Sequence, residues 1–173
     1  MGLTVDRLRD LLRYDPDTGE FVWLPRQNDS REGKRWNTRY AGTVAGNKNL
    51  ANGYTWYHVD GNQYRGHIIA WLYMTGSFPD SDIDHKDRDG FNNKWDNLRE
   101  ATQSQNCANK TARVDNPTGV KGVSWEGSRN KWVASIGVNY RKIKIGRFER
   151  IEDAKAAYDA AAEKYFGEFA RSA

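Results

Sequence analysis

The stretch from Asp84 to Asn106 constrains the chain most, because it sets chemically active side chains around a polar loop. It begins with an adjacent carboxylate and imidazole, Asp84 and His85, and continues through a run of Asp, Asn and Gly residues that favours turns. The chain then becomes apolar and ends in a segment of helix-compatible composition that carries Asn106. If the chain reverses direction between an extended strand and this helix, the three side chains come together.

Such a cluster suits hydrolysis assisted by a divalent metal. The oxygens of Asp84 and Asn106 are ligands that a hard cation such as Mg²⁺ prefers. The imidazole of His85 can take a proton from water near neutral pH. The alternative is that an Asp-His pair in a polar loop is a surface turn without chemistry. Asn97, within the same stretch, is open to the same interpretation as a turn residue.

The stretch resembles the core of HNH nucleases, the ββα-metal motif, in its His-Asn-Asn variant. The family pattern of Asp-His, a polar loop, Asn-Leu-Arg and a helical Asn falls on Asp84-His85, Asn97-Leu98-Arg99 and Asn106. The resemblance implies that His85 is the general base and that Asp84 and Asn106 hold the metal. It implies that Asn97 ties the loop and helps to orient His85. The implied cofactor is a divalent metal ion, Mg²⁺ first and Mn²⁺ as the alternative.

Three cations near this stretch are candidates for contacting a phosphate group of DNA: Arg65, Arg99 and Lys110. A solvated surface explains Arg99 and Lys110 equally well. Relatives often carry Arg or His before the helix that follows Arg65, but packing or helix capping is the simpler interpretation of His67.

The composition excludes several classes of protein. Cys107 is the single cysteine among 173 residues, so a disulfide within the chain and a cysteine-based zinc ribbon are both ruled out. No apolar run approaches the ~20 residues of a membrane span, and the N-terminus has no signal-peptide core. We therefore expect a reducing cytoplasm, in a bacterium or a phage-infected host cell, and no membrane partner.

Positive charge is concentrated near the C-terminus. The formal net charge is +4, and residues 1–112 contain fifteen basic and fifteen acidic residues. The excess therefore lies in residues 113–173, and residues 118–147 hold seven basic residues against Glu126 alone. A polyanion is the natural partner of such a segment.

The N-terminal part predicts a small scaffold. A helix over about residues 4–13 begins at Thr4, and a turn over residues 14–20 leads into a strand at residues 21–24. Two strands at residues 54–60 and 63–66 flank Asp-Gly-Asn, a strong hairpin signal. The apolar run over residues 67–74 fits a helix or a buried strand, and the nuclease resemblance favours a helix.

Residues 26–53 are polar, rich in Gly and Asn, and contain four closely spaced cations: Arg31, Lys34, Arg35 and Arg39. A solvated loop is the preferred interpretation, and contact with the DNA backbone is the alternative.

The last module predicts three strands and one helix. Strands are expected at residues 120–125, 131–138 and 142–148, with turns between them. Lys142 and Lys144 alternate with isoleucines, which sets cations on one face of the sheet. An apolar stripe from Ile151 to Tyr165 predicts the helix, and Gly167 suits its end.

This module resembles the APETALA-type, or ethylene-response-factor, DNA-binding domain. The resemblance rests on Lys121-Gly122-Val123, Lys131 to Ile136, Ile145 to Phe148, and Ala154 to Ala162. In that family the sheet enters the major groove, which implies these DNA contacts: Lys121, Trp125, Arg129, Lys131, Trp132 and Lys144. The plant pattern has Arg at the position of Lys121 and another near Ser124. Because Lys reads guanine less well than the bidentate Arg does, the substitution favours phosphate contact over base reading.

Together these features predict an α+β protein. A ββα-metal nuclease domain with an N-terminal hairpin scaffold covers residues 1–112, with its core motif at 84–110, and a three-stranded antiparallel sheet packed on one helix covers 113–173. The preferred function is a phage-type or homing-type endonuclease that hydrolyses a phosphodiester bond of double-stranded DNA. One active site per chain predicts nicking by a monomer, and no obligate protein partner is evident. The alternatives are a non-catalytic DNA-binding regulator with a decayed HNH core and a protein that acts on RNA.

Overall fold

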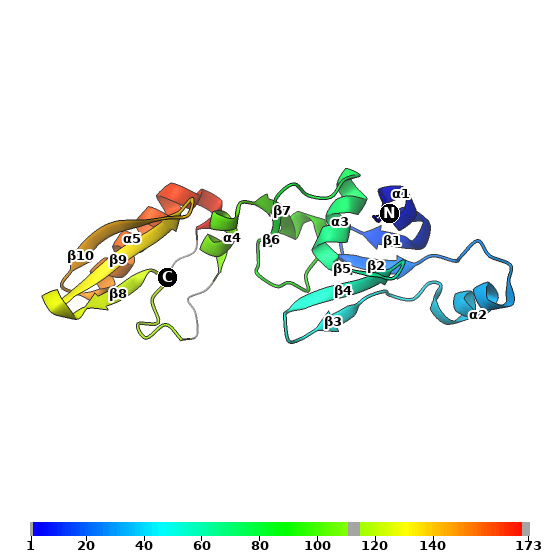
Figure 1. Cartoon of the computed structure of the whole chain (residues 1–173), viewed down its shortest axis with the longest axis horizontal. Helices are drawn as coiled ribbons and strands as arrows, with labels where there is room; N and C mark the ends of the chain where they lie inside the picture. The colour runs from blue at the N-terminus through cyan, green and yellow to red at the C-terminus, as the bar shows by residue number, and fades with distance from the viewer. Residues whose placement is uncertain (1, 111–114, 171–173) are drawn as a thin grey trace. The chain divides into compact units, whose positions relative to one another are not determined.

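The computed structural model describes residues 2–110 and 115–170 and confirms the α+β class. The chain forms two compact units, one ending at Glu100 and the other beginning at Ala101, which are coloured from blue to green and from green to red in Figure 1. The expected domain boundary at residue 112 lies outside the described residues. Within the described ranges, no helix is both long enough and apolar enough to cross a bilayer.

The first unit is built from short elements joined by tight turns. In chain order they are α1 (Val5–Leu11), β1 (Leu12–Asp15), β2 (Glu20–Trp23), α2 (Arg31–Tyr40), β3 (Asn47–Asn49), β4 (Tyr54–Val59), β5 (Asn62–Arg65), α3 (Gly66–Thr75), β6 (Asp82–His85), η1 (Trp95–Asn97) and β7 (Leu98–Ala101). They form a β1–β2 hairpin, a β3–β4–β5 sheet and a β6–β7 pair.

The N-terminal scaffold follows its sequence signals. The hydroxyl of Thr4 accepts a hydrogen bond from the backbone N–H of Arg7 at 3.2 Å, which caps α1. The β1–β2 hairpin closes at Gly19, whose φ of +75° is the left-handed conformation that glycine adopts readily. Its α-carbon lies so close to the backbone of Asn93 and Lys94 that a side chain could not fit. The hairpin is therefore pressed against the polar loop of the predicted motif.

The core of the first unit gathers around Phe21 and α3. Six of its side chains are at most 1% exposed: Leu8, Leu12, Phe21, Val59, Ile69 and Ala70. The apolar run over residues 67–74 is a helix, α3, which ends at Gly76 with a φ of +86°. The hairpin expected around Asp60-Gly61 is confirmed, because β4 and β5 pair there in antiparallel register.

The prediction of a loop over residues 26–53 is wrong, because this segment contains α2 and β3 (Figure 1). Ser30 caps α2 by accepting a hydrogen bond from the N–H of Gly33 at 3.0 Å. The helix lacks an apolar stripe, and Gly33 is its one buried residue. It is held instead by a tertiary contact, in which Trp36 meets Trp23 edge to face with ring centroids 5.5 Å apart.

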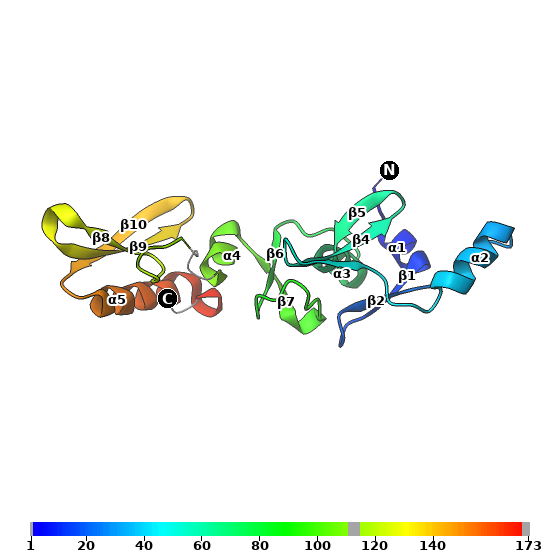
Figure 2. The same ribbon diagram turned by 90° about the horizontal axis from the view of Figure 1, so that it is seen from below.

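The second unit contains the predicted sheet and helix. Its elements are α4 (Gln103–Asn109), β8 (Val123–Glu126), η2 (Gly127–Arg129), β9 (Lys131–Val138), β10 (Arg141–Phe148), α5 (Ile151–Phe166) and η3 (Gly167–Phe169). The strands pair antiparallel in the order β10–β9–β8. Figure 2 shows α5 lying along one side of this sheet. Four residues of α5 are buried: Ala154, Tyr158, Ala162 and Phe166.

The register divides the sheet into a face that α5 covers and an open face. On β9, the side chains of Trp132, Ala134 and Ile136 belong to the core with α5. Ser135 and Gly137 alternate along β9 with those core residues, so they face the opposite side of the sheet. Lys144 pairs with Ser135 and Lys142 with Gly137, so the two lysines lie on this open face. The predicted segregation of Lys and Ile on the third strand is confirmed.

Candidate functional site

Strand β6 carries Asp84 and His85 into the interior of the first unit. Both residues are 5% exposed, although each has a polar side chain. Their burial distinguishes them from a surface turn, in which an Asp-His pair would be solvated. The loop that follows returns to β7 through the η1 turn, and the two strands pair.

Asn97 is the hub of this loop. Its side-chain nitrogen donates to Oδ1 of Asp87 at 2.9 Å and to the carbonyl of Asn92 at 2.8 Å. Its side-chain oxygen accepts from the backbone N–H of Asp87 at 3.1 Å, and its own carbonyl accepts from the N–H of Lys86 at 2.9 Å. These four bonds hold the two ends of the loop together, so Asn97 fixes the backbone beside His85.

Asn93 makes the hydrogen bond that orients the His85 ring. Its Oδ1 lies 3.3 Å from Nε2 of His85, while its Nδ2 donates to the carbonyl of Phe91 at 3.3 Å. Because the Phe91 carbonyl accepts from the amide nitrogen, the atom facing His85 is an acceptor. This contact favours the tautomer of His85 that carries its proton on Nε2, in which the lone pair lies on Nδ1.

Asn93 is itself deeply anchored. It is 2% exposed, and its backbone carbonyl accepts a 2.6 Å hydrogen bond from the hydroxyl of Tyr14. A side chain at Gly66, the first residue of α3, would approach its amide nitrogen to 2.7 Å. From the sequence, Asn93 is one of several residues that favour turns in this loop. Nothing in an Asn-rich loop distinguishes the one residue that packs against a distant hairpin.

The environment of His85 favours the neutral imidazole. Burial lowers the pKa of His85 below its ordinary value. The hydrogen bond with Asn93 and the nearby carboxylates, chiefly Asp87 and Asp84, oppose this shift without reversing it. A neutral imidazole with a fixed tautomer can act as a general base.

A second imidazole and a phenol ring pack beside His85. His67, on α3, meets His85 edge to face with ring centroids 4.9 Å apart, and Tyr54 lies 5.2 Å from His67 and 6.0 Å from His85. Burial lowers the pKa of His67 to about 3, and its buried Nδ1 has no hydrogen-bond partner among the described residues. Arg65 lies over the Tyr54 ring, 5.0 Å from its centroid, at the edge of this cluster.

Asp84 is paired with Arg99 on the neighbouring strand β7. Nε and Nη2 of Arg99 both donate to Oδ2 of Asp84 at 3.0 Å, and both side chains are largely buried. The charge of this carboxylate is therefore balanced by a guanidinium in the structure. No group of three or more His, Cys, Asp or Glu in the described part of the chain forms a metal cage. Few protein ligands are usual for Mg²⁺, which keeps waters and substrate oxygens.

The remaining predicted ligand, Asn106, lies on α4 in the second unit. The helix begins with a capping box, in which Thr102 and Gln105 exchange hydrogen bonds, and Asn106 follows in the next position. The assignment of Asn106 to the metal stays a prediction. Lys110 is the residue at which this helix ends.

The open face of the second unit's sheet carries a cationic row that is paired with two acids, Glu126 and Glu149. Lys131 pairs with Glu149, while Lys144 and Arg147 both approach Glu126, the former at 3.9 Å. Arg129 pairs with the same carboxylate at 3.2 Å. The hydrogen bond from Arg147 lowers the pKa of Glu126 to about 2. Sequence analysis did not single out Arg147 as a DNA contact, although it follows the same alternation as Lys144 across a bulge.

Three residues predicted to contact DNA lie outside this cationic row. The ammonium of Lys121 donates to the carbonyls of Cys107, Ala108 and Lys110, which satisfies the end of α4. Trp132 belongs to the core that α5 covers, and Trp125, directly opposite it on β8, packs against its ring at 5.0 Å. This placement does not support Lys121, Trp125 or Trp132 as members of the cationic row.

Comparison with known proteins agrees with both predicted modules. Residues 64–108 match a family described as HNH endonuclease, and residues 118–168 match the AP2 domain. Protein 3.8 of Escherichia phage T7 is 31% identical over 108 residues, which cover 62% of this chain and 88% of that protein. An uncharacterized HNH endonuclease, L560 of Acanthamoeba polyphaga mimivirus, is 36% identical over 104 residues. These cover 60% of this chain and 53% of that protein, about half its length.

Proposed function

This chain belongs to the family of phage T7 protein 3.8 and carries an HNH endonuclease domain and an AP2 domain; from this premise, we propose that it hydrolyses phosphodiester bonds of duplex DNA. The second unit binds the duplex, and the first unit presents the reacting groups to one strand. The observation that carries the proposal is the buried, neutral His85, whose tautomer Asn93 fixes beside the carboxylate of Asp84.

His85 acts as the general base in this proposal. Nδ1 of His85 takes a proton from the attacking water, while Nε2 donates to Asn93 and keeps the ring in place. Packing of His67 and Tyr54 against the ring excludes bulk water from its faces. Asn97 fixes the loop that follows His85 and so would keep the imidazole at a constant distance from the scissile phosphate.

Asp84 would be a ligand of a divalent metal ion, and Mg²⁺ suits its hard oxygen donors best, with Mn²⁺ as the alternative. The second ligand, Asn106, stays a prediction from the resemblance to the motif. When bound, the ion supplies positive charge that stabilises the developing phosphorane and the leaving oxygen. Arg99 holds the Asp84 carboxylate in a fixed orientation. Arg65, which is exposed beside the imidazole cluster, would contact a non-bridging phosphate oxygen.

The open face of the β8–β9–β10 sheet is the proposed duplex-binding surface of the second unit. Lys131 and Lys144 lie on this face, on β9 and β10, and Arg129 lies in the turn between β8 and β9. Their partners are solvent-exposed or partly exposed carboxylates, which phosphate can replace at little cost. Since the row is rich in Lys, it contributes affinity for the backbone more than base selection.

One active site per chain predicts that a monomer nicks one strand. The relatives come from a phage and a virus of amoebae, which favours action in the cytoplasm of an infected cell.

The decisive experiment incubates supercoiled plasmid with the full chain, with and without Mg²⁺. Open circles that form only with the ion, and that disappear in His85→Ala, support the proposal. Plasmid that stays supercoiled with Mg²⁺ and with Mn²⁺ would refute it.

A DNA-binding regulator with an inactive HNH core is the second candidate. The observation in its favour is the Asp84–Arg99 pair, in which a guanidinium already neutralises the carboxylate. The same assay separates the two candidates, since the regulator retains plasmid in a gel without cutting it.

A further inference from the structure

We propose that the exposed face of α2 is a second DNA-binding surface, through which the first unit binds the phosphate backbone. This inference rests on the proposed function, because it names a contact that the nuclease makes with its substrate. It concerns Arg31, Lys34, Arg35 and Arg39, which we call the α2 cationic face. All four side chains are exposed.

The face is organised by the helix period. Arg31, Arg35 and Arg39 are spaced four residues apart, so they line up along one side of α2, with Lys34 next to them. At 1.5 Å per residue, the three arginines span roughly 12 Å. A DNA strand carries one phosphate per about 3.4 Å of helix axis, so this row matches about three or four successive phosphates.

The opposite side of α2 attaches the helix to the first unit. Trp36 meets Trp23 of β2, and Arg26 lies over the Trp36 ring at 3.9 Å. The side chain of Asn37 accepts from the N–H of Arg26 at 2.8 Å and donates to its carbonyl at 3.0 Å. The helix is thus fixed in place, although it contributes one buried residue to the unit. A helix held this firmly without adding to the core presents its outer face in a fixed orientation.

The close approach of Gly33 sets this orientation. A side chain at Gly33 would come within 2.3 Å of the carbonyl of Asn28, so the first turn of α2 packs directly on the backbone that leads into it. Glycine in the interior of a helix is unfavourable because of its conformational freedom when unfolded. The contact with Asn28 accounts for its presence here.

The charge of the first unit explains why such a surface is needed. Residues 26–39 contain five basic and two acidic residues, whereas the rest of residues 1–100 contains nine basic and thirteen acidic residues. A nuclease unit with this acidic excess is repelled by DNA except where α2 projects. Within the described ranges, Arg31, Lys34 and Arg35 form no ion pair, so their charge is available to a polyanion.

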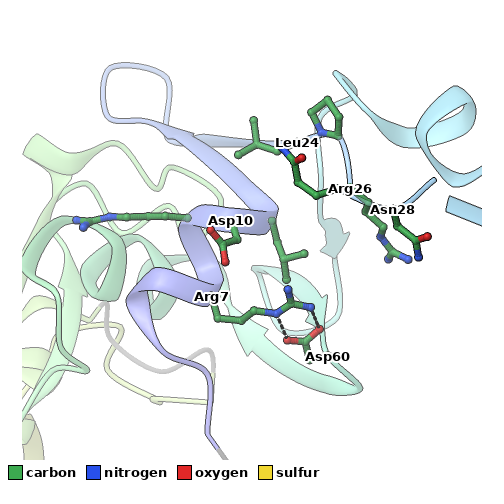
Figure 3. A pocket seen from close by; sticks show the side chains of 10 residues that line it. Arg7, Asp10, Leu24, Arg26, Asn28 and Asp60 are labelled. Atoms are coloured by element: carbon green, nitrogen blue, oxygen red, sulfur yellow. Dashed lines mark hydrogen bonds and ion pairs between the residues drawn. The ribbon is translucent and has the colours of Figure 1, made fainter. Parts of the chain in front are cut away.

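The hollow beside α2 does not explain these cations. Figure 3 shows Arg26 and Asn28 on one side of it and the Arg7–Asp60 pair on another. Arg7 donates to both oxygens of Asp60, at 2.8 and 3.0 Å, so its charge is already balanced. None of the four residues of the α2 cationic face lines this hollow, so a ligand bound there would leave them unused.

The test compares the salt dependence of duplex binding by the full chain. The variant Arg31→Gln/Arg35→Gln/Arg39→Gln keeps good helix formers and removes three charges. The control Arg150→Gln/Lys155→Gln/Lys164→Gln removes three charges at or along α5, on the covered side of the second unit's sheet. Binding of a labelled duplex is followed by fluorescence anisotropy without divalent metal, over a range of salt concentrations.

The slope of log affinity against log salt should fall by about 0.9 for each phosphate that the protein no longer neutralises, hence by about two to three in the α2 variant. It should be unchanged in the control. Gly33→Ala, which keeps every charge but displaces the helix, should also reduce the slope. Equal slopes for wild type and the α2 variant would overturn the inference.

Two further measurements distinguish a failure of the proposed function from a failure of the inference about α2. If the wild-type chain itself fails to bind duplex DNA at low salt, the proposed function fails and not α2 alone. Protection of the α2 arginines from phenylglyoxal by duplex DNA, mapped by mass spectrometry, should accompany binding. Full modification in the complex would overturn the inference, even if the triple variant were misfolded. Stronger protection by structured RNA than by duplex DNA would do the same.

Discussion

The side-chain oxygen of Asn93 lies 3.3 Å from Nε2 of His85, and the amide nitrogen of the same residue is committed to the Phe91 carbonyl. Two weak hydrogen bonds in series therefore decide which nitrogen of the imidazole carries the proton. The proposed base depends on a residue eight positions away that lies outside the family motif pattern.

Replacing Asn93 by Ala should slow plasmid nicking by about 100-fold, because a misplaced catalytic group costs rate on this scale. The double variant with His85→Ala should be no slower than His85→Ala alone, since Asn93 acts through the imidazole. Nicking rates under saturating DNA test this. A further decrease in the double variant would mean that Asn93 has a separate role, and unfolding curves serve as the control for its structural bonds.

Removing Arg99 should leave the buried carboxylate of Asp84 without the guanidinium that balances its charge. We expect Arg99→Ala to lower the free energy of unfolding by about 3 kcal/mol, within the range for breaking a buried pair. Asp84→Asn/Arg99→Ala should be destabilised much less, because no uncompensated charge remains. Denaturant unfolding measures both. If Mg²⁺ binds at Asp84, then millimolar Mg²⁺ should restore part of the stability of Arg99→Ala and none of the double variant.

Neutralising Glu126 should strengthen duplex binding. The carboxylate holds Arg147, Arg129 and Lys144 and repels phosphate from the open face of the sheet. Glu126→Gln keeps the shape and removes the charge, so affinity should rise about tenfold at low salt and less at high salt. Glu163→Gln, at an exposed position of α5, is the matched control. Unchanged affinity in Glu126→Gln would remove this face from the interface.

Burial of His67 makes stability depend on pH. The pKa of His67 falls to about 3 in the folded protein, while an unfolded histidine keeps its ordinary value near 6.5. Below pH 6.5 the unfolded chain binds the proton first, so stability decreases as the pH falls from about 6.5 towards 3. The slope is at most about 1.4 kcal/mol per pH unit.

Unfolding at several pH values, with wild type and His67→Phe, measures this contribution. The difference in unfolding free energy between the two should change as the pH falls, because the wild type alone is weakened by protonation at this position. His58→Gln, at an exposed position of β4, should follow the wild type. If the difference between wild type and His67→Phe stays constant as the pH falls, His67 is not the source of the effect. The remaining pH dependence then belongs to other groups whose pKa the fold lowers, such as His85 and Asp87.

The sequence predicted those parts of the molecule that local pattern determines. The alternation of Lys142 and Lys144 with isoleucines and the stripe of α5 indicated the sheet and its helix, because two-residue and 3.6-residue periods survive in the fold. The Asp84-His85 pair could be found from the spacing of the motif. Each of these features is determined by residues that lie close together in the sequence.

Tertiary contacts decided the rest. The helix α2 was missed because Trp23 stabilises it from outside, and the role of Asn93 was missed because Tyr14 anchors it from 79 residues away. The side on which Trp132 lies could not be predicted from the resemblance, which assigned it to the DNA contacts. The register of β9 turns it towards α5, and its contact with DNA stays a prediction.

The hydroxyl of Tyr14 and the carbonyl of Pro16 each bond to the polar loop, at Asn93 and Trp95. The segment that matches the nuclease family, residues 64–108, omits both of these supporting groups. A fragment trimmed to that segment would keep every residue of the motif but would lack the two hydrogen bonds that support the polar loop. The smallest part of the chain that keeps the shape of the motif therefore starts no later than β1, far upstream of Asp84 and His85.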